Sequence, residues 1–165
     1  MPVSRDQAFW KLFKVKNSIF DLKSDVKDDI LHEIVANLVK AGAIEEDLRE
    51  AVLQALRERE ELASTGIGQN VAIPHVKVAG IDQAVTSLCA HKEGVEWAAV
   101  DGEAVHVFFV VLRPEEPGEN HDPERHLEMM RWIAELARNR DFRVFAQRSK
   151  TRKELVDLLK EMSTR

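Results

Sequence analysis

The run Val105–Leu112 constrains the fold of this chain more than any other segment. It reads Val-His-Val-Phe-Phe-Val-Val-Leu, so seven of its eight residues are apolar, and most of these are β-branched or aromatic. Side chains of a strand alternate between two faces, and a strand that is apolar almost throughout is therefore covered on both faces. The run predicts a central strand of a sheet with further elements packed on either side.

The part of the chain that precedes this strand predicts helices. Apolar residues recur at helical spacing over 26–39. We expect Ser24 to be the N-cap of this helix and Gly42 to follow its last turn, where glycine is favoured. A second helix is predicted over 45–60, and a short amphipathic helix over 6–13.

Beyond the central strand, residues 114–120 are rich in proline and glycine and predict a loop. Asp122 is expected to cap the helix that follows, with Pro123 at its first position. Thr151 and Glu154 have the spacing of a capping box that opens the last helix. The helices predicted in this part of the chain cover 123–137, 142–147 and 152–162.

Further strands and turns are predicted in the middle of the chain. Extended segments are expected at 19–22, 71–74 and 84–90, and turns at Gly94 and Gly102. Helices therefore flank a block of strands on both sides. This order predicts an α/β fold, in which a mixed central β-sheet is flanked by helices in a single layered domain over residues 1–165.

Charge and cysteine content limit the classes of function. The net charge is −5, which argues against a nucleic-acid partner, and basic residues between 138 and 153 alternate with acidic ones as on a solvated helix face. Cys89 is the single cysteine, so the sequence offers no internal disulfide and no cysteine pair for a metal. No stretch is long and apolar enough to span a bilayer. We expect a cytoplasmic protein that meets a membrane only indirectly, through a transporter.

The segment 64–75 carries the strongest sign of chemistry. A polar loop that contains Gly66 and Gly68 leads into a short apolar strand ending in Pro74 and His75. Proline lacks a backbone donor, so we expect strand pairing to stop there and His75 to lie just past the strand end, where ligands of α/β sheets bind. The two glycines allow the backbone to approach a phosphate closely. The alternative is that His75 only closes a turn.

Several separated segments resemble the fructose- and mannitol-type enzyme IIA of the phosphoenolpyruvate-dependent sugar phosphotransferase system, a family that includes the nitrogen-regulatory IIA proteins. The resemblance covers the region from about 18 to 162. Two departures accompany it: Gln69-Asn70 stands where the family commonly has Asn-Gly, and Val76 where it often has glycine. The matching segments are Arg59-Glu60, Ser64-Thr65-Gly66-Ile67-Gly68, Ala72-Ile73-Pro74-His75, Gly94-Val95-Glu96-Trp97, Asp101-Gly102-Glu103-Ala104-Val105 and His126-Leu127.

The resemblance implies a phosphotransferase component. His75 would accept a phosphoryl group from the phosphohistidine of the carrier protein HPr and pass it to a cysteine of an enzyme IIB. A neutral imidazole nitrogen is nucleophilic near pH 7, which suits this transfer. An alternative role is that of a regulatory binding protein, whose choice of partner changes when His75 is phosphorylated. A third possibility, a small-molecule binding domain without phosphoryl transfer, has only the polar loop in its favour.

The same resemblance implies roles for further residues. Arg59 would bind phosphoryl oxygens through its planar guanidinium, with Arg57 as the rival if the helix phase differs. His126, in the first turn of a helix, would donate a hydrogen bond to the phosphoryl group; the alternative is a solvent-facing residue. Ser64 and Thr65 would hydrogen-bond either within the loop or to the phosphoryl group. No cofactor or metal is implied, because His121 and His126 are five residues apart and do not share a helix face well.

Overall fold

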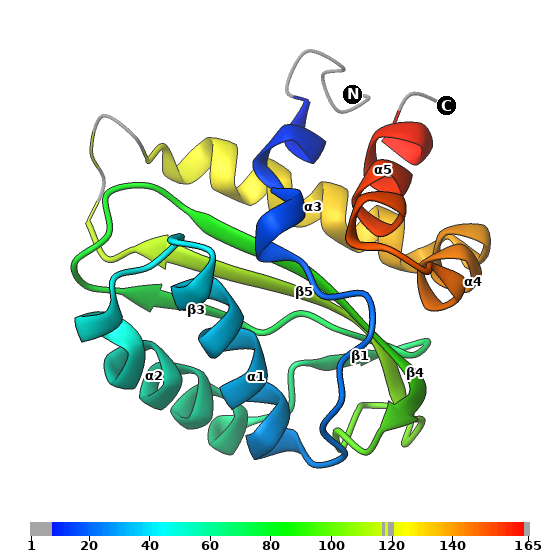
Figure 1. The fold of residues 1–165 in the computed structure, drawn as a ribbon. Coiled ribbons are helices and arrows are strands. Elements are labelled where there is room, and N and C mark those ends of the chain that lie inside the picture. The colour runs from blue at the N-terminus through cyan, green and yellow to red at the C-terminus, as the bar shows by residue number, and fades with distance from the viewer. Residues whose placement is uncertain (1–7, 117, 119–120, 164–165) are drawn as a thin grey trace.

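A mixed sheet of five strands forms the centre of the protein in a computed structural model that describes residues 8–116, 118 and 121–163 (Figure 1). The longest strands, β4 and β5, are antiparallel neighbours, whereas β2 and β3 both run parallel to β5 along its other edge. The short β1 pairs antiparallel with β2. The predicted α/β fold with a mixed sheet is thus confirmed. The strands are β1 Gly66–Gly68, β2 Val71–Ala72, β3 His75–Val78, β4 Val85–Val95 and β5 Val105–Pro114.

The strand β5 is the central strand that its apolar sequence predicts. Its side chains alternate between two separate apolar clusters, since Phe108 and Val110 belong to one and Phe109 and Val111 to the other. Figure 1 shows the corresponding layers: α1 and α2 cover one face of the sheet, and α3, α4, α5 and the N-terminal segment cover the other. The helices are α1 Lys27–Lys40, α2 Arg49–Leu62, α3 Pro123–Arg138, α4 Arg140–Arg148 and α5 Arg152–Ser163.

Local signals at the helix ends are largely confirmed. Asp122 caps α3, because its side chain accepts a hydrogen bond from the backbone N–H of Glu124 at 3.0 Å. Thr151 accepts from the N–H of Glu154 at 3.0 Å, which is one half of the predicted capping box. The other half is displaced by one residue, since the Glu154 carboxylate accepts from Lys150 N at 3.3 Å. The backbone of Gly42 has a φ of 77°, as expected just beyond the C-cap.

The start of α1 differs from the prediction. Val26 is the N-cap and makes no side-chain cap hydrogen bond, so the assignment to Ser24 was wrong. The Ser24 hydroxyl donates instead to the Glu33 carboxylate at 2.9 Å, and that carboxylate also accepts from the backbone N–H groups of Lys23 and Ser24. A glutamate one turn inside the helix therefore holds the incoming chain, and the serine side chain is drawn away from the helix end.

Other boundaries also differ from the prediction. The helix predicted over 45–60 opens as a 3-10 turn, Glu46–Leu48, and continues to Leu62. The segment predicted as a strand at 19–22 runs beside β4 but forms only an isolated bridge from Ile19 to Cys89. Gly94 lies inside β4 at a register shift and does not end the strand.

The N-terminal and loop predictions fall partly outside the described residues. The amphipathic helix expected over 6–13 is a 3-10 turn, Phe9–Leu12, followed by a second, Val15–Asn17. Residues 6 and 7 of the predicted helix lie outside the described part of the chain, as do Pro117 and Asn120 of the predicted loop. No helix in the described ranges is long and apolar enough to cross a membrane.

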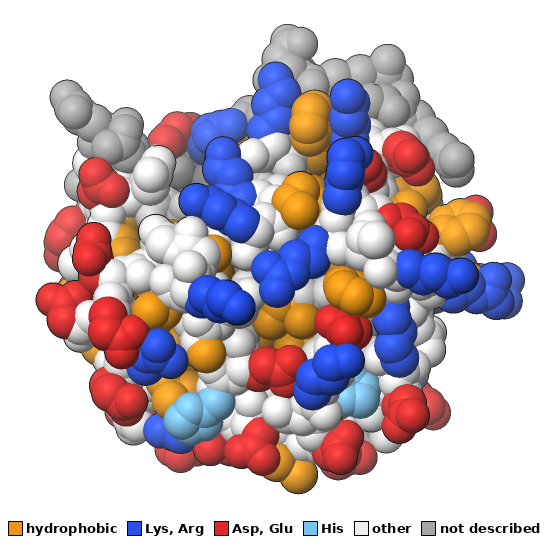
Figure 2. All heavy atoms as spheres, in the orientation of Figure 1, with side chains coloured by type: hydrophobic (Ala, Val, Ile, Leu, Met, Phe, Trp, Pro, Cys, Tyr) orange, Lys and Arg blue, Asp and Glu red, His pale blue; other side chains and the backbone are white. Residues whose placement is uncertain are grey.

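Charge is unevenly distributed over the surface. Figure 2 shows lysine and arginine side chains gathered over the N-terminal segment and α5, although the net charge of the chain is −5. Two lysines of these elements flank Trp10, with Nζ of Lys11 and Lys160 at 5.5 and 5.1 Å from the centroid of its ring. Acidic side chains are most frequent along the left and lower edges of the same view, and some also lie beside the basic ones near α5.

The only thiol is enclosed in the sheet. Cys89 on β4 is fully buried, and its sulfur lies 3.2 Å from the Ser87 hydroxyl. Burial raises the pKa of this thiol to about 12, and the Ser87 contact offsets only part of that effect. The side chain thus acts as a small apolar group in the core, as its apolar surroundings in the sequence indicate.

A stability test follows from the packing of β1. A Cβ atom at Gly66 would lie 2.7 Å from Cβ and 2.9 Å from Cα of Ala99, which neither group can relieve by rotation. We expect Gly66→Ala to lower the free energy of unfolding by about 1–3 kcal/mol, the usual cost of overpacking. Gly118→Ala is the control, because its Cβ would have no atom within 4 Å. Equal urea midpoints for both variants would contradict the close approach.

Candidate functional site

His75 lies where the sheet pairing pauses between β2 and β3. Residue pairing with β5 leads from Ala72 opposite Phe108 to His75 opposite Val111. The expectation that pairing ends at Pro74 was wrong, because His75 begins β3. Proline has no N–H to donate, but its carbonyl oxygen accepts from Val111 N at 2.9 Å, and this hydrogen bond carries the ladder across the pause.

The ring of His75 is oriented by its own backbone neighbourhood. Its Nδ1 lies 3.0 Å from the carbonyl oxygen of Ile73. A carbonyl oxygen only accepts, so the ring proton is assigned to Nδ1 and the lone pair to Nε2. The side chain is half-buried. The nucleophilic nitrogen of the neutral ring is therefore Nε2.

Ile73 is in turn held by the loop that precedes β1. Its backbone N–H donates to the carbonyl oxygen of Thr65 at 3.0 Å. Ile73 is thus held at both of its backbone groups, its N–H by the loop at Thr65 and its carbonyl oxygen by the ring of His75. The backbone groups of Ile73 face away from β5; the residue that faces β5 is Pro74, which has no N–H to donate to it.

His126 is the second imidazole of the site. It lies in the first turn of α3, is 9% exposed, and its ring centroid is 5.6 Å from that of His121, which is 8% exposed. Burial, assisted by the charges of Arg113, His121 and His75, lowers the pKa of His126 to about 4. The ring is therefore neutral at pH 7. Its Nδ1 is buried and makes no hydrogen bond within the described residues.

His75, Arg113 and His121 each contribute to the lowered pKa of His126, which indicates that these four residues lie in one neighbourhood. The sequence interpretation did not include Arg113, although a charged side chain near the end of an otherwise apolar strand was a usable signal. It considered His121 only as a metal ligand. The four residues come from β3, β5, α3 and the turn before α3.

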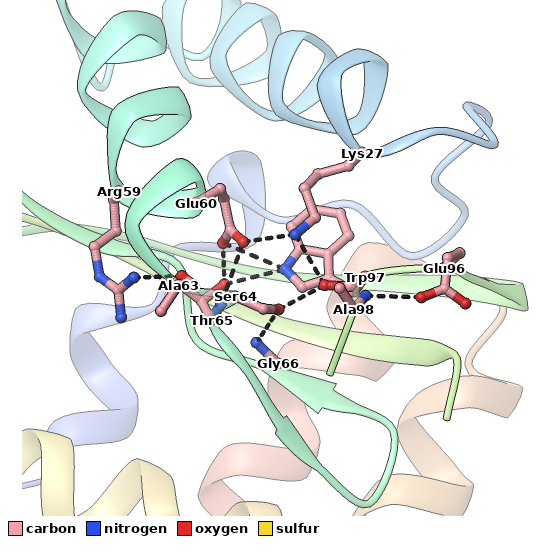
Figure 3. A network of polar contacts seen from close by, with 10 residues as sticks. All are labelled: Lys27, Arg59, Glu60, Ala63, Ser64, Thr65, Gly66, Glu96, Trp97 and Ala98. Atoms are coloured by element: carbon pink, nitrogen blue, oxygen red, sulfur yellow. Dashed lines mark hydrogen bonds and ion pairs between the residues drawn. The ribbon is translucent and has the colours of Figure 1, made fainter. Parts of the chain in front are cut away.

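The hydroxyls of Ser64 and Thr65 are engaged away from this cluster (Figure 3). Ser64 donates to the carbonyl oxygen of Trp97 at 2.5 Å and accepts from Gly66 N at 3.1 Å. Thr65 donates to the Glu60 carboxylate and accepts from Trp97 Nε1, the latter at 3.1 Å. Both hydroxyls thus hydrogen-bond to the loop and its surroundings.

Glu60 is the centre of this second set of contacts. Its side chain is 5% exposed and accepts from Lys27 Nζ at 2.8 Å, Trp97 Nε1 at 3.3 Å and Thr65 N at 3.2 Å, besides the Thr65 hydroxyl. Sequence reasoning quoted Glu60 only as part of a matching pair. Its spacing of four residues from the buried Leu56 would have placed it on the inner face of the helix.

The two candidate arginines differ in their partners. Arg57 makes a two-pronged ion pair with Asp28, at 2.7 and 3.1 Å, which raises the pKa of Arg57 and lowers that of Asp28. Arg59 has no carboxylate partner in the described ranges; its Nη1 donates to Ala63 O at 2.6 Å (Figure 3). The guanidinium of Arg59 makes no hydrogen bond to His75, so the structure leaves it near the loop and not on the ring.

The departures from the family pattern have local explanations. Gln69 and Asn70 both have positive φ angles, 57° and 69°, as a two-residue hairpin turn requires. The Asn70 amide donates to Ala104 O at 2.8 Å and the Gln69 amide oxygen accepts from Arg143, which compensates for the absent glycine. Val76 packs against the apolar cluster beneath α1 and α2.

The fold and the site agree with a known family of phosphotransferase components. The chain belongs to the family described as phosphoenolpyruvate-dependent sugar phosphotransferase system, EIIA 2, whose model matches residues 11–162. This membership confirms the resemblance found in the sequence.

Particular relatives come from both branches of the family. The chain is 28% identical over 141 residues to the PTS system fructose-specific EIIABC component of Bacillus subtilis, a match that covers 86% of this chain but only 21% of that protein. It is 33% identical over 126 residues to a nitrogen regulatory protein of Pseudomonas aeruginosa, covering 76% of this chain and 77% of that one. The crystal structure of nitrogen regulatory protein IIA-Ntr from Neisseria meningitidis superposes with a TM-score of 0.74 at 25% identity, over 91% of this chain and 97% of that chain.

Proposed function

We propose that this protein is a cytoplasmic phosphoryl carrier that accepts a phosphoryl group on Nε2 of His75. The donor is the phosphohistidine of an HPr-type protein, and the acceptor is a cysteine of an enzyme IIB protein or domain. The observation that carries the proposal is the hydrogen bond from Nδ1 of His75 to Ile73 O, which leaves the Nε2 lone pair available in a member of the EIIA 2 family.

The transfer is an exchange of one phosphorus–nitrogen bond for another. The Nε2 lone pair attacks phosphorus while the bond to the donor imidazole breaks, and the donor nitrogen keeps the electron pair. The ring of His75 gains positive charge as the new bond forms. The Ile73 carbonyl oxygen, which accepts from Nδ1–H, stabilises that charge without moving. In the second step, a cysteine thiolate of the IIB partner takes the phosphoryl group and Nε2 regains its lone pair.

The neighbours of His75 stabilise the negative charge of the transferring oxygens. Phosphoryl transfer needs positioning and charge neutralisation more than covalent help. The neutral ring of His126 supplies one N–H donor close to the helix N-terminus, and Arg113 adds positive charge. Arg59 binds further oxygens after its guanidinium leaves Ala63 O.

A regulatory role is the second candidate. It is favoured by the likeness to the nitrogen regulatory protein of Pseudomonas aeruginosa, which matches this chain over similar shares of both proteins. In that role the charge added at His75 decides which partner is bound. Rapid loss of the phosphoryl group to a matched IIB supports the carrier role. Phosphorylation that changes partner binding, with no transfer to any IIB tested, supports regulation.

Incubation with phosphoenolpyruvate, enzyme I and HPr tests the proposal. We expect mass spectrometry to detect one added phosphoryl group per chain, labile in acid as phosphohistidine is. Omission of HPr is the control and should leave the mass unchanged. An unchanged mass in the complete mixture, with a second IIA labelled in parallel, would refute the carrier role.

Replacing Arg59 tests the binding of the phosphoryl oxygens. We expect Arg59→Lys to slow transfer about tenfold, because lysine keeps the charge but loses the planar fork, and a hydrogen bond to a charged group is worth about 1.5 kcal/mol. Stability should change little, since the side chain is only partly buried. Arg57→Lys is the matched control and should transfer at the rate of the unmodified protein. The rates are measured by rapid quench. If Arg59→Lys transfers as fast as Arg57→Lys, backbone groups and not Arg59 bind the phosphoryl oxygens.

A further inference from the structure

The buried carboxylate of Glu60 is connected to His75 by a continuous path of hydrogen bonds. Glu60 accepts from the backbone N–H of Thr65, the carbonyl oxygen of Thr65 accepts from Ile73 N, and the carbonyl oxygen of Ile73 accepts from His75 Nδ1. The three distances are 3.2, 3.0 and 3.0 Å. We propose that Glu60 is a positioning residue for His75, which keeps the ring proton on Nδ1 and the lone pair on Nε2.

The Glu60 carboxylate accepts more hydrogen bonds than an ion pair with Lys27 alone would supply. One carboxylate oxygen, Oε2, accepts from Lys27 Nζ and from Thr65 N, and the other, Oε1, accepts from the Thr65 hydroxyl and from Trp97 Nε1. A buried carboxylate is tolerated when its oxygens are satisfied in this way. Both oxygens therefore bind Thr65, Oε2 through its backbone N–H and Oε1 through its hydroxyl.

Lys27 and Trp97 fix the carboxylate from the far side (Figure 3). The Lys27 ammonium donates to Trp97 O at 2.8 Å as well as to Glu60, and it lies 4.8 Å from the centroid of the Trp97 ring. Lys27 is the first residue of α1, Glu60 lies in the last turn of α2, and Trp97 follows β4. The loop at Thr65 is thus anchored to three separate elements.

The orientation of Ile73 makes this anchor matter for His75. The backbone groups of Ile73 face away from β5, so the position of its N–H depends on Thr65 O. A shift of the Thr65 backbone would move the Ile73 peptide and release the Nδ1 proton. The ring would then sample the tautomer with its proton on Nε2, which lacks the nucleophilic lone pair at that position. The use of Nε2 as the acceptor rests on the function proposed above; the fixed tautomer does not.

Glu60→Gln is the sharpest test, because glutamine keeps the size of the side chain but accepts on one atom only. The NH₂ group then faces either Lys27 Nζ and Thr65 N, which only donate, or Trp97 Nε1 and the Thr65 hydroxyl, of which only the hydroxyl can turn to accept. Either orientation of the amide therefore loses at least one contact of the carboxylate. We expect the ¹⁵N spectrum of His75 to show the Nδ1–H tautomer in the unmodified protein and a mixture in the variant. Phosphoryl acceptance should slow about tenfold to a hundredfold, as expected for a misplaced reacting group. Glu61→Gln, one residue further and exposed, should match the unmodified protein in both measurements.

Two further measurements keep the test decisive. If Glu60→Gln does not fold, Lys27→Met/Glu60→Leu replaces the ion pair with apolar side chains of similar volume and should show the same mixed tautomer. A folded variant of either kind with the tautomer of the unmodified protein would overturn the positioning role. The ¹⁵N measurement needs no phosphoryl donor. An unmodified protein that takes up no phosphoryl group would therefore refute the carrier function alone, and the tautomers would still decide the role of Glu60.

Discussion

His75→Ala is expected to take up no phosphoryl group from phosphoenolpyruvate, enzyme I and HPr, so labelling should fall to the level of a mixture without HPr. The variant removes the nucleophilic nitrogen of His75, and we expect neither His121 nor His126 to take its place. His75→Gln should behave in the same way, because an amide keeps polar contacts but has no nucleophilic lone pair on nitrogen. Mass spectrometry of the intact chain measures the labelling.

Folding and specificity controls accompany this experiment. His75 is half-buried at the start of β3, so its replacement should leave the thermal midpoint near that of the unmodified protein. His32→Ala changes an exposed histidine on α1 and should be labelled fully. Full labelling of His75→Ala would refute the assignment and direct attention to His121 and His126.

The second large effect is expected for His126. His126→Ala should still become phosphorylated on His75 but should accept and transfer the group about a hundredfold more slowly, the cost of losing one aligned donor to a developing charge. His126→Gln should recover part of the rate, because its amide still donates. Rapid-quench transfer to a matched IIB measures both. Rates equal to the unmodified protein in His126→Ala would make this residue part of the helix cap only.

The titration of His126 provides an independent check. Its pKa is lowered to about 4, whereas an unfolded chain has the ordinary value of 6.5. The unfolded state therefore binds the proton more tightly. The contribution of His126 to stability is present above pH 6.5 and is lost as the pH falls toward 4. In NMR, the ring should titrate near pH 4 in the unphosphorylated protein and at a higher pH once His75 carries the negative phosphoryl group.

The sequence predicted the parts of the fold that depend on local patterns. The apolar run of β5 indicates a strand covered on both faces, and Asp122 with Pro123 marks the start of α3, because each signal acts within a few residues. The prediction that Ser24 caps α1 was wrong because the Ser24 hydroxyl donates to the carboxylate of Glu33, nine residues away. Local pattern alone does not reveal that competition.

In the candidate site, too, the sequence predicted only the residues that carry a local signal. His75 stands out in the sequence because a glycine-bearing loop and Pro74 precede it. The roles of Glu60 and Trp97 depend on contacts between residues 37 positions apart in the chain, and the pause at Pro74 is bridged by Val111 from another strand. The burial that lowers the pKa of His126 likewise arises from tertiary packing and not from its neighbours in the sequence.

The enclosed thiol of Cys89 has a kinetic consequence for a protein that carries a phosphoryl group. A reactive thiolate on the same chain could take the phosphoryl group from the histidine. This thiol is fully buried, however, and its pKa is raised to about 12. It therefore supplies almost no thiolate at pH 7 and no route to His75. In the function proposed above, any cysteine that takes the phosphoryl group from His75 must therefore lie outside this sequence. The lifetime of the phosphorylated form would then be set by two events, the arrival of a partner and the attack of water.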